Sequence, residues 1–167
     1  MGRLSGRREE SFRAAFVELW PAARRVARRL VGDQSAADDI AAEALARTFA
    51  RWDRIESLPH RDAWVLRVTT NLALDSLRRR RPPVVATAVS HPEDQLAVRI
   101  ALAAALQGLP ARQREVVVLR YLGDLSEDDV AKALGIGAGS VRTHMQRGLQ
   151  TLRRRLGDDF EGFNLAV

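Results

Sequence analysis

The sequence predicts an all-α protein of two small helical domains joined by a flexible linker, the C-terminal one a helix-turn-helix. Apolar residues recur at helical spacing along most of the chain, and the one strand-like run, Val116 to Leu119, has helical flanks. Pro82-Pro83 opens an aperiodic stretch between two blocks of predicted helices, because neither proline continues a helix. A chain of 167 residues is long enough for one ordinary domain or two very small ones.

The first predicted domain, residues 1–81, begins with an amphipathic helix. Its apolar stripe runs from Phe12 to Leu30, and Gly32-Asp33 ends it. Pro21 lies inside this pattern and predicts a kink or a break near Leu19-Trp20.

Two further helices complete this domain. We expect the first of them to begin at Ser35, with Asp38 in a capping-box arrangement, and to turn an acidic face outward. A polar loop from Asp53 to Arg61 leads into the next helix, which continues into an arginine run at 78–81. The residues expected on the apolar face of that helix are Trp64, Val68, Leu72 and Leu77.

The second domain, residues 96–167 with a short acidic tail, follows a predicted linker at residues 82–95. Glycines end its successive helices, and Ser126 begins one of them with an acid three residues later at Asp129. The predicted helices cover residues 96–106, 113–122, 126–134 and 138–156.

The last two helices are separated by the tight turn Gly135-Ile136-Gly137, a pattern that predicts a helix-turn-helix bound to duplex DNA. The alternative is a small helical bundle whose solvated face happens to be basic. The inward residues of the last helix are expected to be Val141, Met145, Leu149, Leu152 and Leu156. Ser140, Arg142, Thr143, His144, Gln146 and Arg147 are left on the outer faces. All of these except Gln146 are expected to bind the DNA duplex, and Arg142, His144 and Arg147 can reach bases or phosphates.

The charge balance also favours a nucleic-acid partner. The net charge is +6, the sequence pI is about 11.1, and Lys132 is the only lysine. Arginine binds phosphate and guanine edges through a planar fork, although a coding bias from GC-rich DNA also enriches arginine. The chain has no cysteine, and neither a signal peptide nor a membrane span is expected, so we predict a cytoplasmic protein without membrane insertion.

No catalytic residue, metal site or cofactor is expected. Asp38, Asp39 and Glu43 form an acidic helix face, for which a docking or solvated surface is favoured over a nuclease centre. The histidines are scattered without ligand spacing, and no phosphate loop or nucleophile motif occurs.

The helix that ends in the arginine run carries a mixture suited to unpaired bases and phosphates. This mixture comprises Trp64, Arg67, Thr69, Thr70, Asn71, Arg78 and Arg79. Trp64 lies on the apolar stripe, which favours a place in the core over base stacking.

Short segments of both halves resemble a known family when they are taken in order. In the first half they are Gly32-Asp33, Ala37-Asp38-Asp39-Ile40 with Glu43, Trp64 to Val68, Asn71 to Asp75 and the arginine run. In the second half they are Leu109-Pro110, Arg114-Glu115-Val116, Leu119-Arg120-Tyr121, Val130-Ala131, Leu134-Gly135-Ile136 and Gly139-Ser140-Val141-Arg142. Together they resemble the second and fourth conserved regions of bacterial RNA polymerase sigma factors of the small extracytoplasmic-function (ECF) class.

The resemblance implies a dissociable subunit that directs promoter-specific initiation, assists melting and performs no catalysis itself. It implies that Asp39, Ile40 and Glu43 dock on the clamp coiled coil of core RNA polymerase. The helix with Arg67, Asn71, Arg78 and Arg79 would bind the melted promoter element, and the loop at 53–61 would accept a flipped base. The helix-turn-helix would bind the upstream promoter element as duplex, and its domain would meet the polymerase flap. An anti-sigma protein is a further partner that the resemblance allows.

Three positions depart from the family pattern. Ala42 stands where many members have glutamine, Thr70 where a basic residue is frequent, and Gly137 where serine commonly caps the recognition helix. A stand-alone helix-turn-helix regulator is the rival interpretation, and it leaves the first half without a task.

The acidic tail from Asp158 has two interpretations. In the first, the tail frays or packs Phe160 and Phe163 on the helical domain. In the second, the ending Leu165-Ala166-Val167 acts as a degradation tag.

Overall fold

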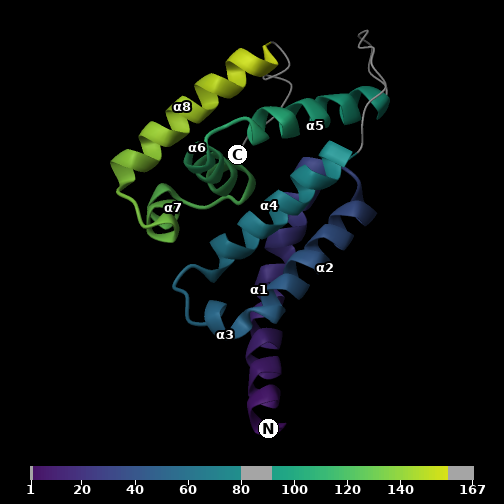
Figure 1. The fold of residues 1–167 in the computed structure, drawn as a ribbon, viewed down its shortest axis with the longest axis vertical. Helices are drawn as coiled ribbons and strands as arrows, with labels where there is room; N and C mark the ends of the chain where they lie inside the picture. The colour runs from purple at the N-terminus through teal and green to yellow at the C-terminus, as the bar shows by residue number, and fades with distance from the viewer. Residues whose placement is uncertain (1, 80–91, 158–167) are drawn as a thin grey trace.

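The computed structural model of the protein describes residues 2–79 and 92–157, and every regular element in these residues is helical (Figure 1). The expected tail and most of the expected linker, 82–91, lie outside the described residues. The elements are α1 (Gly2–Val31), α2 (Gln34–Ala50), α3 (Trp52–Ile55), α4 (Arg61–Arg79), α5 (Pro92–Gln107), α6 (Ala111–Val117), the π-helical turn η1 (Val118–Leu122), α7 (Glu127–Leu134) and α8 (Ala138–Leu156). Since α5 starts at Pro92, the end of the expected linker is already helical.

The first half is built on the long helix α1, which packs along α2 and α4. A kink or a break was expected near Pro21, and α1 does not break there, because it continues through the proline to Val31. Pro21 is exposed, whereas Leu19 and Ala23 on either side of it are buried. Burial of this flanking stripe offsets the backbone hydrogen bond that the proline cannot make.

An aromatic cluster packs against the N-terminal half of α1. Trp52 is 1 % exposed, and its indole Nε1 donates a hydrogen bond of 2.7 Å to the Ser11 hydroxyl. The Phe12 ring lies 5.1 Å from Trp52 and 4.9 Å from Phe49, between their centroids. Trp52 belongs to the short helix α3, which occupies the start of the loop expected from Asp53.

The turn between α1 and α2 differs from the expected capping box. Gly32 ends α1 with a φ of +78°, a conformation that glycine adopts at little cost. Asp33, not Ser35, caps α2, because its side chain accepts a 2.7 Å hydrogen bond from the backbone N–H of Ala36.

The second half contains the helix-turn-helix at the expected place. Ser126 caps α7 by accepting a 3.1 Å hydrogen bond from the backbone N–H of Asp129. Gly135 ends α7 in the left-handed conformation with a φ of +64°, and Gly137 precedes α8 without a side-chain cap. The expected bounds of α8, Ala138 to Leu156, are confirmed.

The helix expected at 113–122 changes its winding halfway. It begins as α6 and continues as η1, where the backbone N–H of Gly123 donates to the carbonyl of Val118, five residues earlier. The wider turn places Leu119 and Leu122 in the core.

One hydrophobic cluster joins the two halves. It contains Leu30 from α1, Leu66 and Leu74 from α4, and Leu119 and Leu122 from η1. The residues of α5 in the same cluster are Leu102, Ala103, Ala105 and Leu106. The two helical domains of the chain therefore share a core, and α5, above α4 in Figure 1, contacts helices of both.

Substitution by alanine is expected to have opposite effects on stability at two glycines of α8. A Cβ on Gly148 would lie 2.8 Å from Cγ2 of Val117, whereas a Cβ on Gly139 would meet nothing within 4 Å. We expect Gly148→Ala to lower the free energy of unfolding by about 1–3 kcal/mol through overpacking. Gly139→Ala should raise it by about 0.4–1 kcal/mol, because alanine restricts the unfolded chain. Urea unfolding followed by circular dichroism measures both, and equal effects would contradict the packing of α8 on α6.

Candidate nucleic-acid interface

The outer face of α8 carries the side chains expected to bind duplex DNA. Ser140, Arg142, Thr143 and Arg147 are exposed, as expected for this face. The Thr143 hydroxyl donates a 2.9 Å hydrogen bond to the carbonyl of Gly139, so it already has a backbone partner.

Arg142 is positioned by the preceding helix. Its Nε lies 2.8 Å from the carboxylate of Glu127 at the start of α7, while its side chain remains 72 % exposed. The hydrogen bond and the charge of Glu127 raise the pKa of Arg142. Because surface ion pairs contribute little stability, this contact orients the guanidinium and leaves it free to exchange partners.

His144 lies deeper than the arginines of its helix. It is half-buried, and its Nδ1 has no hydrogen-bond partner among the described residues. A DNA contact by His144 stays a prediction, with less of the ring available than the sequence suggests.

The capping of α7 also has an electrostatic effect. The Ser126 hydroxyl donates a 2.6 Å hydrogen bond to the Asp129 carboxylate. This hydrogen bond is the largest cause of the lowered pKa of Asp129, and Lys132 adds to it. The cap therefore fixes the start of α7, which is the first helix of the helix-turn-helix.

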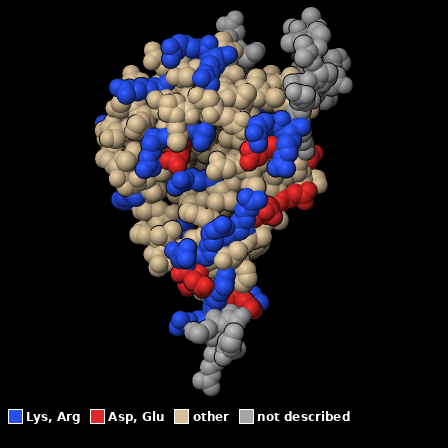
Figure 2. Space-filling model, viewed as in Figure 1, with Lys and Arg blue, Asp and Glu red and all other residues tan. Residues whose placement is uncertain are grey.

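Arginines also gather at the far end of α8. Arg153, Arg154 and Arg155 fill its last turn, and Figure 2 shows basic side chains over this end of the molecule. Arg155 donates to the carbonyl of Ala105, with a distance of 3.4 Å, so one of the three joins α8 to α5.

The helix expected to bind melted DNA faces the second half of the chain. Arg67 lies 2.7 Å from the carboxylate of Glu115 in α6, with 44 % of the arginine side chain exposed. Asn71 and Arg78 line a hollow whose other wall contains Gln107 and Arg114. Arg79 at the end of α4 donates from Nε to the carbonyl of Asp75 at 3.3 Å.

The apolar face of α4 is wider than expected. Trp64, Val68 and Leu72 are only half-buried, whereas Val65, Leu66 and Leu74 are buried. The reason is that α4 packs on α1 and α2 on one side and on the second half on the other. Trp64 packs against the hydrophobic cluster of the first half that contains Leu19, Leu45 and Trp52, as a core position requires.

Thr69 and Thr70 cannot serve as base contacts in this arrangement. Both are buried, and their hydroxyls donate to backbone carbonyls four residues earlier, at 2.9 and 2.8 Å. Sequence periodicity does not predict the burial of these two residues. Threonine is treated as polar, although its hydroxyl can bond to a carbonyl of its own helix.

The acidic face of α2 forms one side of a second hollow. Asp39 and Glu43 are exposed, Ile40 is 9 % exposed, and Glu43 pairs with Arg47 at 2.7 Å. The residues that line this hollow are Asp39, Ile40, Glu43, Arg47, Leu72, Ser76 and Arg79. The residues from α4 were missed by sequence reasoning, because only tertiary packing brings the two helices together. Figure 2 shows acidic side chains along α2 and basic side chains beyond them.

The three acids of α2 do not all point the same way. Asp38 is half-buried and bonded to Arg24 of α1, so it points away from the outer acids. No group of three or more histidine, cysteine, aspartate or glutamate residues that could hold a metal occurs in residues 2–79 and 92–157. Within the same residues, no helix is long and apolar enough to cross a membrane.

These features define a helix-turn-helix protein whose second helix, α8, has a basic outer face. Comparisons with known proteins give its family. Residues 16–82 match the family described as Sigma-70 region 2, and residues 99–152 match Sigma-70, region 4. An RNA polymerase sigma-E factor of Streptomyces coelicolor is 38 % identical over 138 residues, covering 79 % of this chain and 78 % of the relative. The ECF RNA polymerase sigma factor SigW of Bacillus subtilis is 31 % identical over 152 residues, covering 78 % and 80 %.

Solved structures share the same fold. CnrH, solved in complex with the cytosolic domain of CnrY, has a TM-score of 0.55 at 24 % identity, with 89 % of this chain and 88 % of that one covered. The sigma factor RpoE from Bartonella quintana, solved with the anti-sigma factor NepR, has a TM-score of 0.51 at 24 % identity, with 89 % and 98 % covered. The chain belongs to the RNA polymerase sigma factors of the ECF class, and its function is promoter-specific transcription initiation.

Proposed function

We propose a division of labour within this function, in which each half of the chain has its own target. The first half docks on core RNA polymerase and holds the melted promoter element, and the second half binds the upstream element as duplex. The observation that carries this proposal is the separation of two kinds of surface. The hollow between α2 and α4, in which two carboxylates lie beside two arginines and an apolar floor, belongs to the first half, whereas the exposed face with Arg142 and Arg147 belongs to α8.

The α2–α4 hollow suits the clamp coiled coil of the polymerase. Asp39 and Glu43 supply exposed carboxylates, and Ile40 and Leu72 supply an apolar floor. Complementary charge steers such docking, while the apolar residues hold it once water is excluded. Ala42 is exposed beside these acids but has no side-chain amide that could bond to the clamp. Asp39 and Glu43 must therefore make more of the polar contact with the polymerase.

The α4 surface suits melted DNA, with Arg67, Asn71, Arg78 and Arg79 available for phosphates and base edges. Arg67 is paired with Glu115, so DNA must displace that carboxylate in order to reach the arginine. The boundaries proposed for the two domains, 1–81 and 96–167, separate these surfaces from the helix-turn-helix.

Other roles follow from this function. We place the protein in the cytoplasm, where core polymerase and promoter DNA are found, and assign it no catalysis of its own. An anti-sigma protein is a further proposed partner, since a protein of the same fold was solved with an anti-sigma factor. Contact of the second half with the polymerase flap is also proposed.

Transcription with purified core polymerase separates this function from that of a stand-alone regulator. The proposal predicts discrete transcripts that appear only when the chain is added. Tight duplex binding by the chain alone, with no stimulation of core enzyme on any template, would support the regulator instead.

The docking face can be tested by charge reversal. We expect Asp39→Arg or Glu43→Arg to weaken binding to core polymerase at least tenfold, about 1.4 kcal/mol. The helical spectrum should not change, because both side chains are exposed. Glu18→Arg, an equal charge change at an exposed position of α1, is the matched control. Wild-type affinity in both docking variants with an unaltered spectrum would exclude this face.

The recognition helix can be tested by truncating its arginines. Arg142→Ala and Arg147→Ala should each weaken promoter binding by about 1–3 kcal/mol where the contact is bidentate to a base. A phosphate contact would instead lower affinity for all sequences and flatten the salt dependence. Arg154→Ala, at the other end of α8, is the control, and binding is measured by fluorescence anisotropy on promoter and scrambled duplexes. Indifference to both substitutions would place recognition elsewhere.

A further inference from the structure

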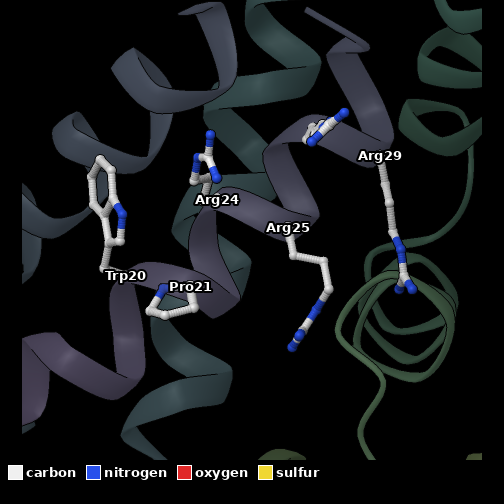
Figure 3. Close-up of a pocket in the computed structure, with 6 residues that line it drawn as sticks. Trp20, Pro21, Arg24, Arg25 and Arg29 are labelled. Carbon is white, nitrogen blue, oxygen red and sulfur yellow. The ribbon is translucent and has the colours of Figure 1, made fainter. Parts of the chain in front are cut away.

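Four arginines form a concave basic surface on α1 that no role described above uses. Arg24, Arg25, Arg28 and Arg29 occupy successive turns beside Trp20 and Pro21, and they are named here the α1 arginine surface (Figure 3). Arg28 is exposed and makes no side-chain ion pair among the described residues. Arg24 is held by Asp38 of α2.

A carboxylate from the second half already occupies part of this surface. Asp124 lies 2.8 Å from Arg29 and 3.4 Å from Arg25, through its two carboxylate oxygens. Arg29 also donates to the carbonyls of Tyr121 and Leu122, at 3.1 and 3.0 Å. In Figure 3 the Arg29 side chain extends from α1 toward the ribbon of the second half.

These ion pairs are exchangeable. The Asp124 side chain is 43 % exposed, and those of Arg25 and Arg29 are 48 % and 36 % exposed. Water and salt screen such pairs, so another anion of higher charge density competes for the same guanidinium groups. Arg67 of α4 is paired in the same way with a carboxylate of the second half, that of Glu115.

We propose that the α1 arginine surface binds backbone phosphates of duplex DNA, and that Asp124 occupies part of this site in the compact arrangement of the chain. The inference rests on the proposed binding of promoter DNA and adds a contact outside both recognised elements. Guanidinium groups repeated at one-turn intervals match a ligand that repeats a single negative charge.

The surroundings of the surface favour DNA over an acidic peptide. A peptide ligand needs apolar anchoring as well as charge, because buried aromatic and aliphatic groups supply most of its binding energy. The aromatic group at the edge of the surface, Trp20, is already stacked on Phe16, with ring centroids 5.6 Å apart and planes at 15°. Apart from Trp20 and Pro21, every residue that lines this surface is an arginine.

The salt dependence of DNA binding tests the site directly. The full-length chain is titrated against a duplex without a promoter, from about 50 to about 200 mM salt. Losing one phosphate contact through Arg28→Gln should reduce the slope of log affinity against log salt by about 0.9. Arg13→Gln, an exposed arginine of α1 outside the surface, is the control and should keep more of the wild-type slope.

Removing the competing carboxylate should have the opposite effect. Asp124→Asn removes the negative charge that faces Arg25 and Arg29 and should raise duplex affinity about two- to fivefold. Asparagine tolerates the φ of +56° at this position, so the substitution retains the fold. Glu18→Gln removes an equal charge from an exposed position of α1 and controls for net charge.

The outcomes separate this inference from the proposed function. A wild-type salt slope in Arg28→Gln, while the wild-type chain still drives promoter-dependent transcription, overturns the DNA site alone and leaves an acidic protein as the ligand of this face. Unchanged affinity in Asp124→Asn overturns the occupation of the site by Asp124. Lack of any promoter-dependent transcription by the wild-type chain overturns the proposed function itself.

Discussion

Burial of one hydrophobic cluster between α1, α4 and the second half determines where every surface of this protein lies. Leu66 of α4 contacts the second half so closely that a Cβ on Gly123 would lie 2.8 Å from its Cδ1. Apolar burial drives such contacts without directing them, so the polar groups around the cluster determine the register of the two halves. Arg99 of α5 contributes by donating to the carbonyl of Arg29 at 2.8 Å, and burial lowers its pKa.

The polar rim of this shared core is composed largely of arginines from one half and acids from the other. Arg67 meets Glu115, while Arg25 and Arg29 meet Asp124. Each of these arginines is partly exposed, so each contact adds little stability but gives the cation a defined position. In a protein that must bind a polyanion, the same groups then have two alternative partners, internal carboxylates and phosphates. The compact chain is therefore expected to bind DNA more weakly by itself than its count of arginines suggests.

Local signals in the sequence were sufficient for the helix-turn-helix, because Ser126 and Gly135 cap α7 through contacts within a few residues. Long-range packing decided the features that the sequence did not predict. Pro21 remained helical because residues on both sides of it in α1 are buried, and Gly148 permits close contact between α8 and Val117. The acids of α2 were recognised by their pattern, but their neighbours from α4 and the pairing of Arg67 with Glu115 join residues distant in sequence. The roles of the site residues remain predictions.

Unfolding of a variant in one half, observed from the other half, tests the shared core most directly. All three tryptophans, Trp20, Trp52 and Trp64, lie in the first half, whereas Leu119 lies in the second and is fully buried. Leu119→Ala should destabilise the protein by about 2–5 kcal/mol. If the core is shared, tryptophan fluorescence and circular dichroism will both shift to lower urea and remain coincident. A tryptophan transition that stays at its wild-type urea concentration, while part of the helical signal is lost earlier, would contradict this account.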